Sequence, residues 1–185
     1  MVIDQCSRRV TGFALFAKMP TSTEICRFLD RAIKRADARP KYVVSDKGKQ
    51  FFCATFRSWC RQRGVRPRFG ALGRSASIAV VERFIRSMKV ECTRRIRVPF
   101  ELAAMRHELA CYVTWFNEYR PHQALSGKVP DEVYRDRAHR PPVFETRSMR
   151  AQAPNGVQPV NRLTLAVRFF EGRRHLPIVQ LRPAA

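Results

Sequence analysis

Two acidic residues, Asp46 and Glu82, are the side chains of this sequence best suited to chemistry, and 35 residues separate them. Asp46 follows a short apolar run and precedes Gly48, whereas Glu82 lies early in a helical pattern. Carboxylates in such positions can ligate divalent cations, and two ions can activate the attacking oxygen and stabilise the leaving oxygen in phosphoryl transfer. The plainer interpretation is a turn residue and a glutamate paired with Arg86, worth roughly 0.3 kcal/mol.

The elements around these acids follow an α/β pattern. Alternating and β-branched residues predict strands at 2–4, 9–16, 41–45 and 65–69. Apolar residues at helical spacing predict helices at about 21–38, 52–63, from 78 and 100–119. Thr21 and Glu24 fit a capping box at the first helix, and Gly64 fits a left-handed cap after the second. Asp46 then follows a strand, at the edge where open α/β sheets gather ligands.

The helix expected from about residue 78 has two distinct faces. Projected at about 100° per residue, its apolar side chains share one side: Val81, Phe84, Ile85, Met88 and Cys92. Polar side chains share another side: Glu82, Arg86, Lys89 and Thr93. One face therefore packs, and the other presents an acid beside two cations.

Four short motifs occur in order along residues 1–137. They are Ser45-Asp46-x-Gly48-x-Gln50-Phe51, Val81-Glu82-Arg83-Phe84, Tyr119-Arg120-Pro121-His122-Gln123-Ala124-Leu125 and Pro130-Asp131-Glu132-Val133-Tyr134. Together they resemble the integrase catalytic core of bacterial insertion-sequence transposases of the Asp-Asp-Glu type. The resemblance implies an RNase H-like mixed sheet flanked by helices, two Mg²⁺ or Mn²⁺ ions, and DNA cleavage followed by strand transfer.

The resemblance also assigns roles to single residues. Asp46 and Glu82 would be catalytic residues and metal ligands. DNA near the metal site would be contacted by Arg74, Arg83, Arg86 and Lys89, for which solvated surface cations are the alternative. The Arg120-Pro121-His122 motif has two open interpretations, DNA contact or a structural network at the helix end that includes Asn117.

The first acid of the family triad is missing from these motifs. By the resemblance, that Asp lies on an opening strand of the sheet, and Val2-Ile3-Asp4 matches the second strand. Asp4 is then a turn residue more readily than a metal ligand. We expect either an upstream start or a destabilised chain, because strands 2–4 and 41–45 would lose their shared neighbour.

A formal charge of +21 indicates a polyanionic partner. Between Arg57 and Arg97 there are twelve Arg and Lys residues but only two acids, Glu82 and Glu91. This bias favours phosphate binding over a surface of mixed sign, so DNA is the expected partner. A membrane surface is disfavoured, since no apolar run approaches the length of a span. We expect a cytoplasmic protein associated with the bacterial nucleoid, and a homo-oligomer in full-length form.

Six cysteines occur without a C-x-x-C pair, which favours reduced thiols over disulfides or a zinc cluster. His107 and Cys111 are one helical turn apart and could suit a metal, but packing or surface roles are favoured because no second ligand pair lies nearby in the sequence.

The chain divides into three expected parts: a partial catalytic core at 1–137, a Pro-rich linker at 138–162 and a β-hairpin tail at 163–185. The leading hypothesis is the C-terminal part of a transposase core. The alternative is a non-catalytic DNA-binding remnant that associates with intact transposase. A ribosomal or chromatin-type basic protein would explain the charge but not the order of the motifs.

Overall fold

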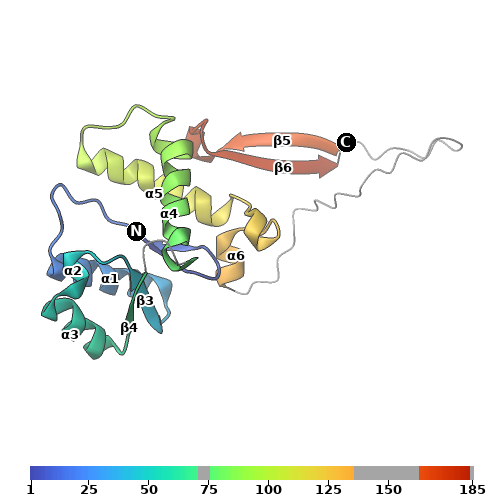
Figure 1. Ribbon diagram of the computed structural model, residues 1–185. Coiled ribbons are helices and arrows are strands. Elements are labelled where there is room, and N and C mark those ends of the chain that lie inside the picture. Colours follow the sequence, from blue (N-terminus) through green and yellow to red (C-terminus); the bar gives the residue numbers. More distant parts are fainter. Residues whose placement is uncertain (71–75, 136–162, 184–185) are drawn as a thin grey trace, which may run out of the picture.

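The computed structural model describes residues 1–70, 76–135 and 163–183 (Figure 1). Strands and helices alternate through the first half of the chain, and helices dominate the second half up to a C-terminal hairpin. The predicted α/β class is therefore confirmed. The linker expected at 138–162 lies outside the described residues.

Strands β1 (Val2–Ile3) and β2 (Val10–Gly12) form an antiparallel pair. In the turn between them, the Asp4 carboxylate accepts hydrogen bonds from the backbone N–H and the hydroxyl of Ser7, both at 2.8 Å. The prediction of a strand over 9–16 is wrong beyond Gly12, because the ladder ends where Gly12 pairs with Val2, the first residue of β1.

Helix α1 (Ser22–Ala36) begins at the predicted capping box. The Thr21 hydroxyl accepts from the Glu24 N–H at 3.3 Å, and the Glu24 carboxylate accepts from the Thr21 N–H at 2.8 Å. The helix ends just before Asp37, which adopts a left-handed conformation with φ of 48°. Its buried face packs closely on β2, since a Cβ at Gly12 would lie 2.8 Å from that of Ala32.

Strands β3 (Tyr42–Ser45) and β4 (Arg66–Phe69) pair in parallel, and Ser45 lies opposite Phe69. The helix expected over 52–63 is two helices, α2 (Lys49–Phe52) and α3 (Ala54–Arg63). The break occurs because Cys53 is extended and its Sγ accepts a hydrogen bond from the Phe56 N–H, which caps α3. Gly64 ends α3 with φ of 65°, as predicted. A cluster of buried residues joins α1 to α3: Ile25, Cys26, Leu29, Phe56, Trp59 and Cys60.

Helix α4 (Ala76–Met88) continues into a π-helical turn, η1 (Lys89–Thr93), and is followed by the long helix α5 (Leu102–Glu118). α4 contacts both β1 and β3. The second core cluster lies where α4, η1 and α5 meet β2 and the C-terminal hairpin. Its buried members are Val10, Phe84, Cys92, Cys111, Tyr112, Trp115, Phe116 and Leu176.

The described strands do not form one continuous mixed sheet, in keeping with the expectation that strands 2–4 and 41–45 lack their shared neighbour. Within the described residues there are three two-stranded sheets, β1–β2, β3–β4 and a C-terminal pair, and no ladder joins β1 to β3. Helix α4 contacts one strand of each pair, β1 of the antiparallel pair and β3 of the parallel pair. Helix packing, rather than strand pairing, therefore holds the two pairs together.

A short 3₁₀ turn, η2 (Gln123–Leu125), leads to helix α6 (Pro130–Tyr134), which closes the core domain. Asp131 accepts from Arg9 Nε at 2.6 Å, and the Tyr134 hydroxyl donates to the Ala36 carbonyl at 2.9 Å. The fourth motif of the sequence, which forms α6, thus ties this helix to the turn before β2 and to the end of α1.

The C-terminal hairpin comprises β5 (Leu163–Phe169), the turn η3 (Phe170–Gly172) and β6 (Pro177–Pro183). As predicted, it docks on the rest of the chain. Leu176 is fully buried in the α4–α5 core, and Trp115 Nε1 donates to the Pro177 carbonyl at 2.9 Å. The strands themselves extend away from α5 (Figure 1).

Candidate functional site

Asp46 lies immediately after β3, at the edge where β3 and β4 both end. The Gly70 N–H donates to the Ser45 carbonyl at 2.9 Å, which aligns the ends of the two strands. Asp46 is exposed, and its Oδ1 accepts a hydrogen bond from the Gly48 N–H at 3.1 Å. This hydrogen bond orients the carboxylate within the turn. A Cβ at Gly48 would come within 2.5 Å of the Gln50 side-chain amide, so the Gln50 side chain would have to move to admit one. The turn therefore holds a carboxylate at the strand end, as the sequence predicts.

Glu82 lies on the exposed face of α4, opposite the buried Phe84 and the half-buried Ile85. The helical projection made from the sequence is confirmed, since apolar positions face the core and Glu82 faces outward. Because α4 packs against β3, the helix that carries Glu82 lies against the strand that ends at Asp46. The fold thus brings together the two elements that present these carboxylates.

Three of the four predicted DNA-contacting cations lie exposed on this helix and its continuation: Arg83, Arg86 and Lys89. The fourth, Arg74, lies outside the described residues. The plainer interpretation of Glu82 as the partner of Arg86 is not what the structure shows, because among the described residues neither Glu82 nor Asp46 forms an ion pair within 4.0 Å. Both carboxylates keep oxygens available for a cation.

Glu91, to which the sequence analysis gave no role, anchors the end of this helix. Its carboxylate accepts from Arg120 Nη2 at 2.6 Å and Nε at 3.0 Å, and from the Tyr112 hydroxyl at 2.8 Å. Burial and the neighbouring Glu91 charge raise the pKa of Tyr112, so its hydroxyl stays a donor. Because Glu91 lies in η1, these bonds fix the continuation of α4 to the end of α5. No sequence signal marks the pair, since Arg120 lies 29 positions after Glu91.

The motif that begins at Arg120 has a structural role in this fold. The His122 ring packs edge-on against Phe116 at 4.5 Å, and burial, followed by the nearby Arg120 charge, lowers the pKa of His122 to about 4. Asn117 is buried and binds both backbone groups of Val10, accepting at 2.9 Å and donating at 3.0 Å. Of the two interpretations left open by the sequence, the geometry favours a structural network at the helix end for Arg120 and His122. Asn117 bonds β2 instead of these two residues.

Asp4 does not complete a triad. One of its carboxylate oxygens, Oδ2, is engaged by Ser7, and the described residues contain no three-ligand cluster that includes Asp4, Asp46 or Glu82. The turn interpretation of Asp4 is therefore the one that the geometry supports.

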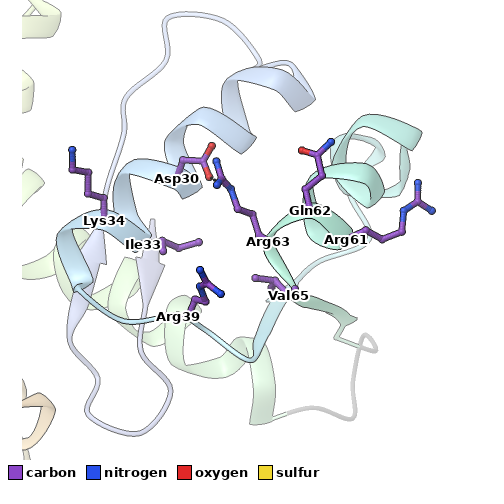
Figure 2. Close-up of a pocket in the computed structure, with 9 residues that line it drawn as sticks. Asp30, Ile33, Lys34, Arg39, Arg61, Gln62, Arg63 and Val65 are labelled. Carbon is purple, nitrogen blue, oxygen red and sulfur yellow. Dashed lines mark ion pairs between the residues drawn. The ribbon is translucent and has the colours of Figure 1, made fainter.

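A hollow lined by residues of α1 and α3 has a volume of about 650 Å³ (Figure 2). Its single lining acid, Asp30, is paired with Arg63 at 2.9 Å. Four cations also line it: Lys34, Arg39, Arg61 and Arg63. Neither Asp46 nor Glu82 borders this hollow.

Two family models, both described as integrase core domain, match residues 1–75 and 63–130. The chain is 30% identical over 135 residues to transposase InsF of insertion sequence IS3A from Escherichia coli K12, covering 71% of this chain and 46% of that protein. It is 29% identical over 127 residues to an uncharacterized 31.7 kDa protein of insertion element IS407 from Burkholderia multivorans, covering 65% and 44%. The chain spans about half the length of these relatives.

Solved structures show the same fold at low identity. The HTLV-2 integrase catalytic core domain in complex with magnesium aligns with a TM-score of 0.57 at 18% identity, covering 71% of this chain and 80% of that one. A simian T-cell lymphotropic virus intasome in complex with a PP2A regulatory subunit aligns with a TM-score of 0.53 at 15% identity, covering 92% and 65%. The α/β fold is thus similar to the RNase H-like core of retroviral integrases.

In the part of the chain that the structure describes, no helix is long and apolar enough to cross a membrane. The motif order, the fold and the matches across residues 1–130 agree with one another, and the chain belongs to the integrase core domain family of Asp-Asp-Glu recombinases.

Proposed function

We propose that this chain is the C-terminal part of the catalytic core of an insertion-sequence transposase, which cleaves DNA and transfers the strand with divalent metal ions. The observation that carries the proposal is the placement of Asp46 at the end of β3 and of Glu82 on the exposed face of the helix packed against that strand. The likeness to an insertion-sequence transposase supports the same substrate class.

The residues present fit a hard cation. Asp46 and Glu82 offer exposed carboxylate oxygens, the ligands that Mg²⁺ and Mn²⁺ prefer. When bound, the ions would activate the attacking oxygen and stabilise the leaving oxygen of the phosphodiester. The related integrase core was solved with magnesium, which supports this choice. Two carboxylates alone hold two ions weakly, so phosphate oxygens of DNA and a third acid would complete the site.

The third acid would come from a strand that precedes β1. By family resemblance this strand lies between β1 and β3, and those strands share no ladder in the described residues. Val2 and Val43 both pack against the α1–α3 core, so the two strands are already held near one another. We infer that residues 1–137 form an N-terminally truncated core, that 138–162 link it to the tail at 163–185, and that an upstream strand brings the missing Asp to Asp46 and Glu82.

DNA would lie across the exposed face of α4. Arg83, Arg86 and Lys89 place three positive charges on the helix of Glu82, and Arg74 precedes that helix in the sequence. Each phosphate that these cations neutralise releases counterions, which supplies affinity without sequence specificity. The full-length protein would act as a homo-oligomer on transposon ends and target DNA in the cytoplasm, associated with the nucleoid.

The second candidate function is a non-catalytic DNA-binding remnant that associates with intact transposase. The observation in its favour is that the described residues do not bring a third carboxylate to Asp46 and Glu82. Both candidates predict salt-sensitive DNA binding, and only the first predicts metal-dependent cleavage by a chain that has all three acids.

A plasmid-nicking assay with Mn²⁺ separates the two candidates. The chain as given and the chain extended upstream from its native gene are compared, each as wild type and as Glu82→Gln. Glu101→Gln is the matched control, because Glu101 is an exposed acid at the start of α5. Nicking by the extended protein that Glu82→Gln lowers by more than about 100-fold supports the transposase, because changes even to outer-shell partners of a metal cost about 10–100-fold. DNA binding without nicking in every form supports the remnant.

A further inference from the structure

A cluster of three potential metal ligands lies where the C-terminal hairpin meets α5, away from the candidate active site. His107 and Cys111 are one turn apart on α5, and Glu171 comes from η3, the turn of the hairpin. Cys111 Sγ lies 3.2 Å from Glu171 Oε2 and 3.8 Å from His107 Nε2. All three ligand atoms lie within 4.8 Å of one another. The sequence favoured packing for His107 and Cys111 because the third ligand is 60 residues away from Cys111.

The meeting of these three side chains is fixed by the packing around them. Arg173 makes two hydrogen bonds to Glu108, each at 3.0 Å, and so binds the hairpin turn to α5. Leu176 is buried in the core that includes Cys111. Glu171 has a left-handed backbone conformation, with φ of 46°, which is uncommon for a non-glycine residue. The hairpin turn is therefore held with the Glu171 carboxylate against the thiol.

The distances fit a tetrahedral ion of small radius. Ligands about 2.0–2.3 Å from Zn²⁺ lie roughly 3.5 Å from one another at tetrahedral angles. The two distances to Cys111 Sγ, 3.2 and 3.8 Å, bracket that value. The remaining distance, between His107 and Glu171, has to shorten by at most about 1.3 Å, which side-chain rotation of two exposed residues can provide. Water would take the fourth position.

The donor set selects a borderline-soft ion. Imidazole nitrogen, thiolate sulfur and a carboxylate oxygen are the three ligand types of protein zinc sites, whereas Mg²⁺ takes oxygen ligands alone. Magnesium at the active-site carboxylates and zinc at this cluster are thus chemically distinguishable. We propose that His107, Cys111 and Glu171 bind one Zn²⁺ ion, which fastens the C-terminal hairpin to α5. This proposal does not depend on the function proposed for Asp46 and Glu82.

Binding would displace the thiol proton of Cys111. Burial and the hydrogen bond to Glu171 raise the pKa of Cys111 to about 11, and Arg173 opposes the shift. Because the ligand is the thiolate, zinc affinity should rise with pH. Charged and titratable groups of both packed elements face the thiol or its neighbours: His107 and Glu108 from α5, and Glu171, Arg173 and His175 from the hairpin turn.

Zinc titration of the full chain under reducing conditions tests the proposal. Zinc affinity is measured by competition with a chromophoric chelator, for wild type and for His107→Gln, Cys111→Ser and Glu171→Gln. We expect one tight site per chain in the wild type and at least a 10-fold loss in each variant, because each removes one of three protein ligands. Matched controls are Cys6→Ser, an exposed thiol outside the cluster, and Glu101→Gln, an exposed acid at the start of α5. Both should bind zinc as the wild type does.

Two further readouts make the result decisive. Cobalt substituted for zinc should show a thiolate-to-metal charge-transfer band that Cys111→Ser abolishes and Cys6→Ser retains. Zinc should also raise the unfolding temperature of wild type and Cys6→Ser but not of Cys111→Ser, since a ligand that binds only the folded state stabilises it. Unchanged zinc affinity in His107→Gln and Cys111→Ser would overturn the proposal, as would a wild type that binds no zinc at micromolar concentration. The cluster would then be only a hydrogen-bonded group, in which the Cys111 thiol contacts Glu171 and His107 without a metal.

Discussion

Replacing Asn117 with Leu tests how α5 holds the strand pair beside the candidate site. The Asn117 amide supplies both hydrogen-bond partners of the Val10 backbone, at 2.9 and 3.0 Å, inside the core. Leu has a similar volume, so little cavity results, but the N–H and C=O of Val10 lose their partners. Each unsatisfied buried group costs about 1–3 kcal/mol, and the expected loss in the free energy of unfolding for the two groups is about 2–6 kcal/mol. That is a large share of the roughly 5–15 kcal/mol typical of a domain.

Urea unfolding followed by far-UV circular dichroism measures this loss. Gln123→Leu is the matched control, because Gln123 carries an exposed amide in η2 just beyond α5. The control should stay within about 0.5 kcal/mol of the wild type, as exposed substitutions usually do. A loss below about 0.5 kcal/mol for Asn117→Leu would refute the reasoning, because the backbone groups of Val10 would then have other partners in the folded chain.

Three other predictions concern charge, pH and thiol reactivity. Replacing both Arg86 and Lys89 with Ala should reduce the slope of log binding constant against log salt concentration, for duplex DNA, by about 0.9 per charge removed. An unchanged slope would show that these two residues do not contact DNA. The pKa of His122 is about 4 when folded and 6.5 as the unperturbed value, so the unfolded chain takes up the proton first. Stability should therefore be full above about pH 6.5 and fall by on the order of 3 kcal/mol, less the part screened by solvent, toward pH 4, and His122→Gln should flatten this loss in urea titrations. Iodoacetamide should label Cys6, which is exposed, and Cys53, whose pKa is lowered by its hydrogen bond to Ser22, before the buried thiols. Mass spectrometry of the cysteine-containing peptides would show the order of labelling, and a buried cysteine that reacted first would contradict this prediction.

Local signals in the sequence predicted the parts of the fold that local physics controls. Thr21 and Glu24 form a capping box because both partners lie within one turn. Gly64 caps α3 because only a residue tolerant of positive φ ends that helix. The exposed face of α4 followed from helical periodicity, and Asp46 from its place after an apolar strand. These features position the candidate carboxylates, and they were all available before the structure.

Features that depend on distant contacts were not predictable in this way. The break at Cys53 arises from a weak sulfur cap that propensity does not reveal. Glu91 looks like an ordinary helical acid until the π-helical turn directs it to Arg120, 29 residues away. The ligand cluster depends on a hairpin that returns to α5 after a long intervening segment, which brings Glu171 beside Cys111. Sequence spacing carries no information about such encounters.

Bound Mn²⁺ is the most direct measure of the central claim that Asp46 and Glu82 form a cation site beside DNA. Electron paramagnetic resonance counts the Mn²⁺ bound to the chain in the presence of a short duplex, whose phosphates supply further oxygen ligands. We expect Asp46→Asn and Glu82→Gln each to lower the affinity of the wild type at least about 10-fold, whereas Glu101→Gln leaves it unchanged. Equal Mn²⁺ affinity in all four proteins would contradict the assignment of these two carboxylates as metal ligands.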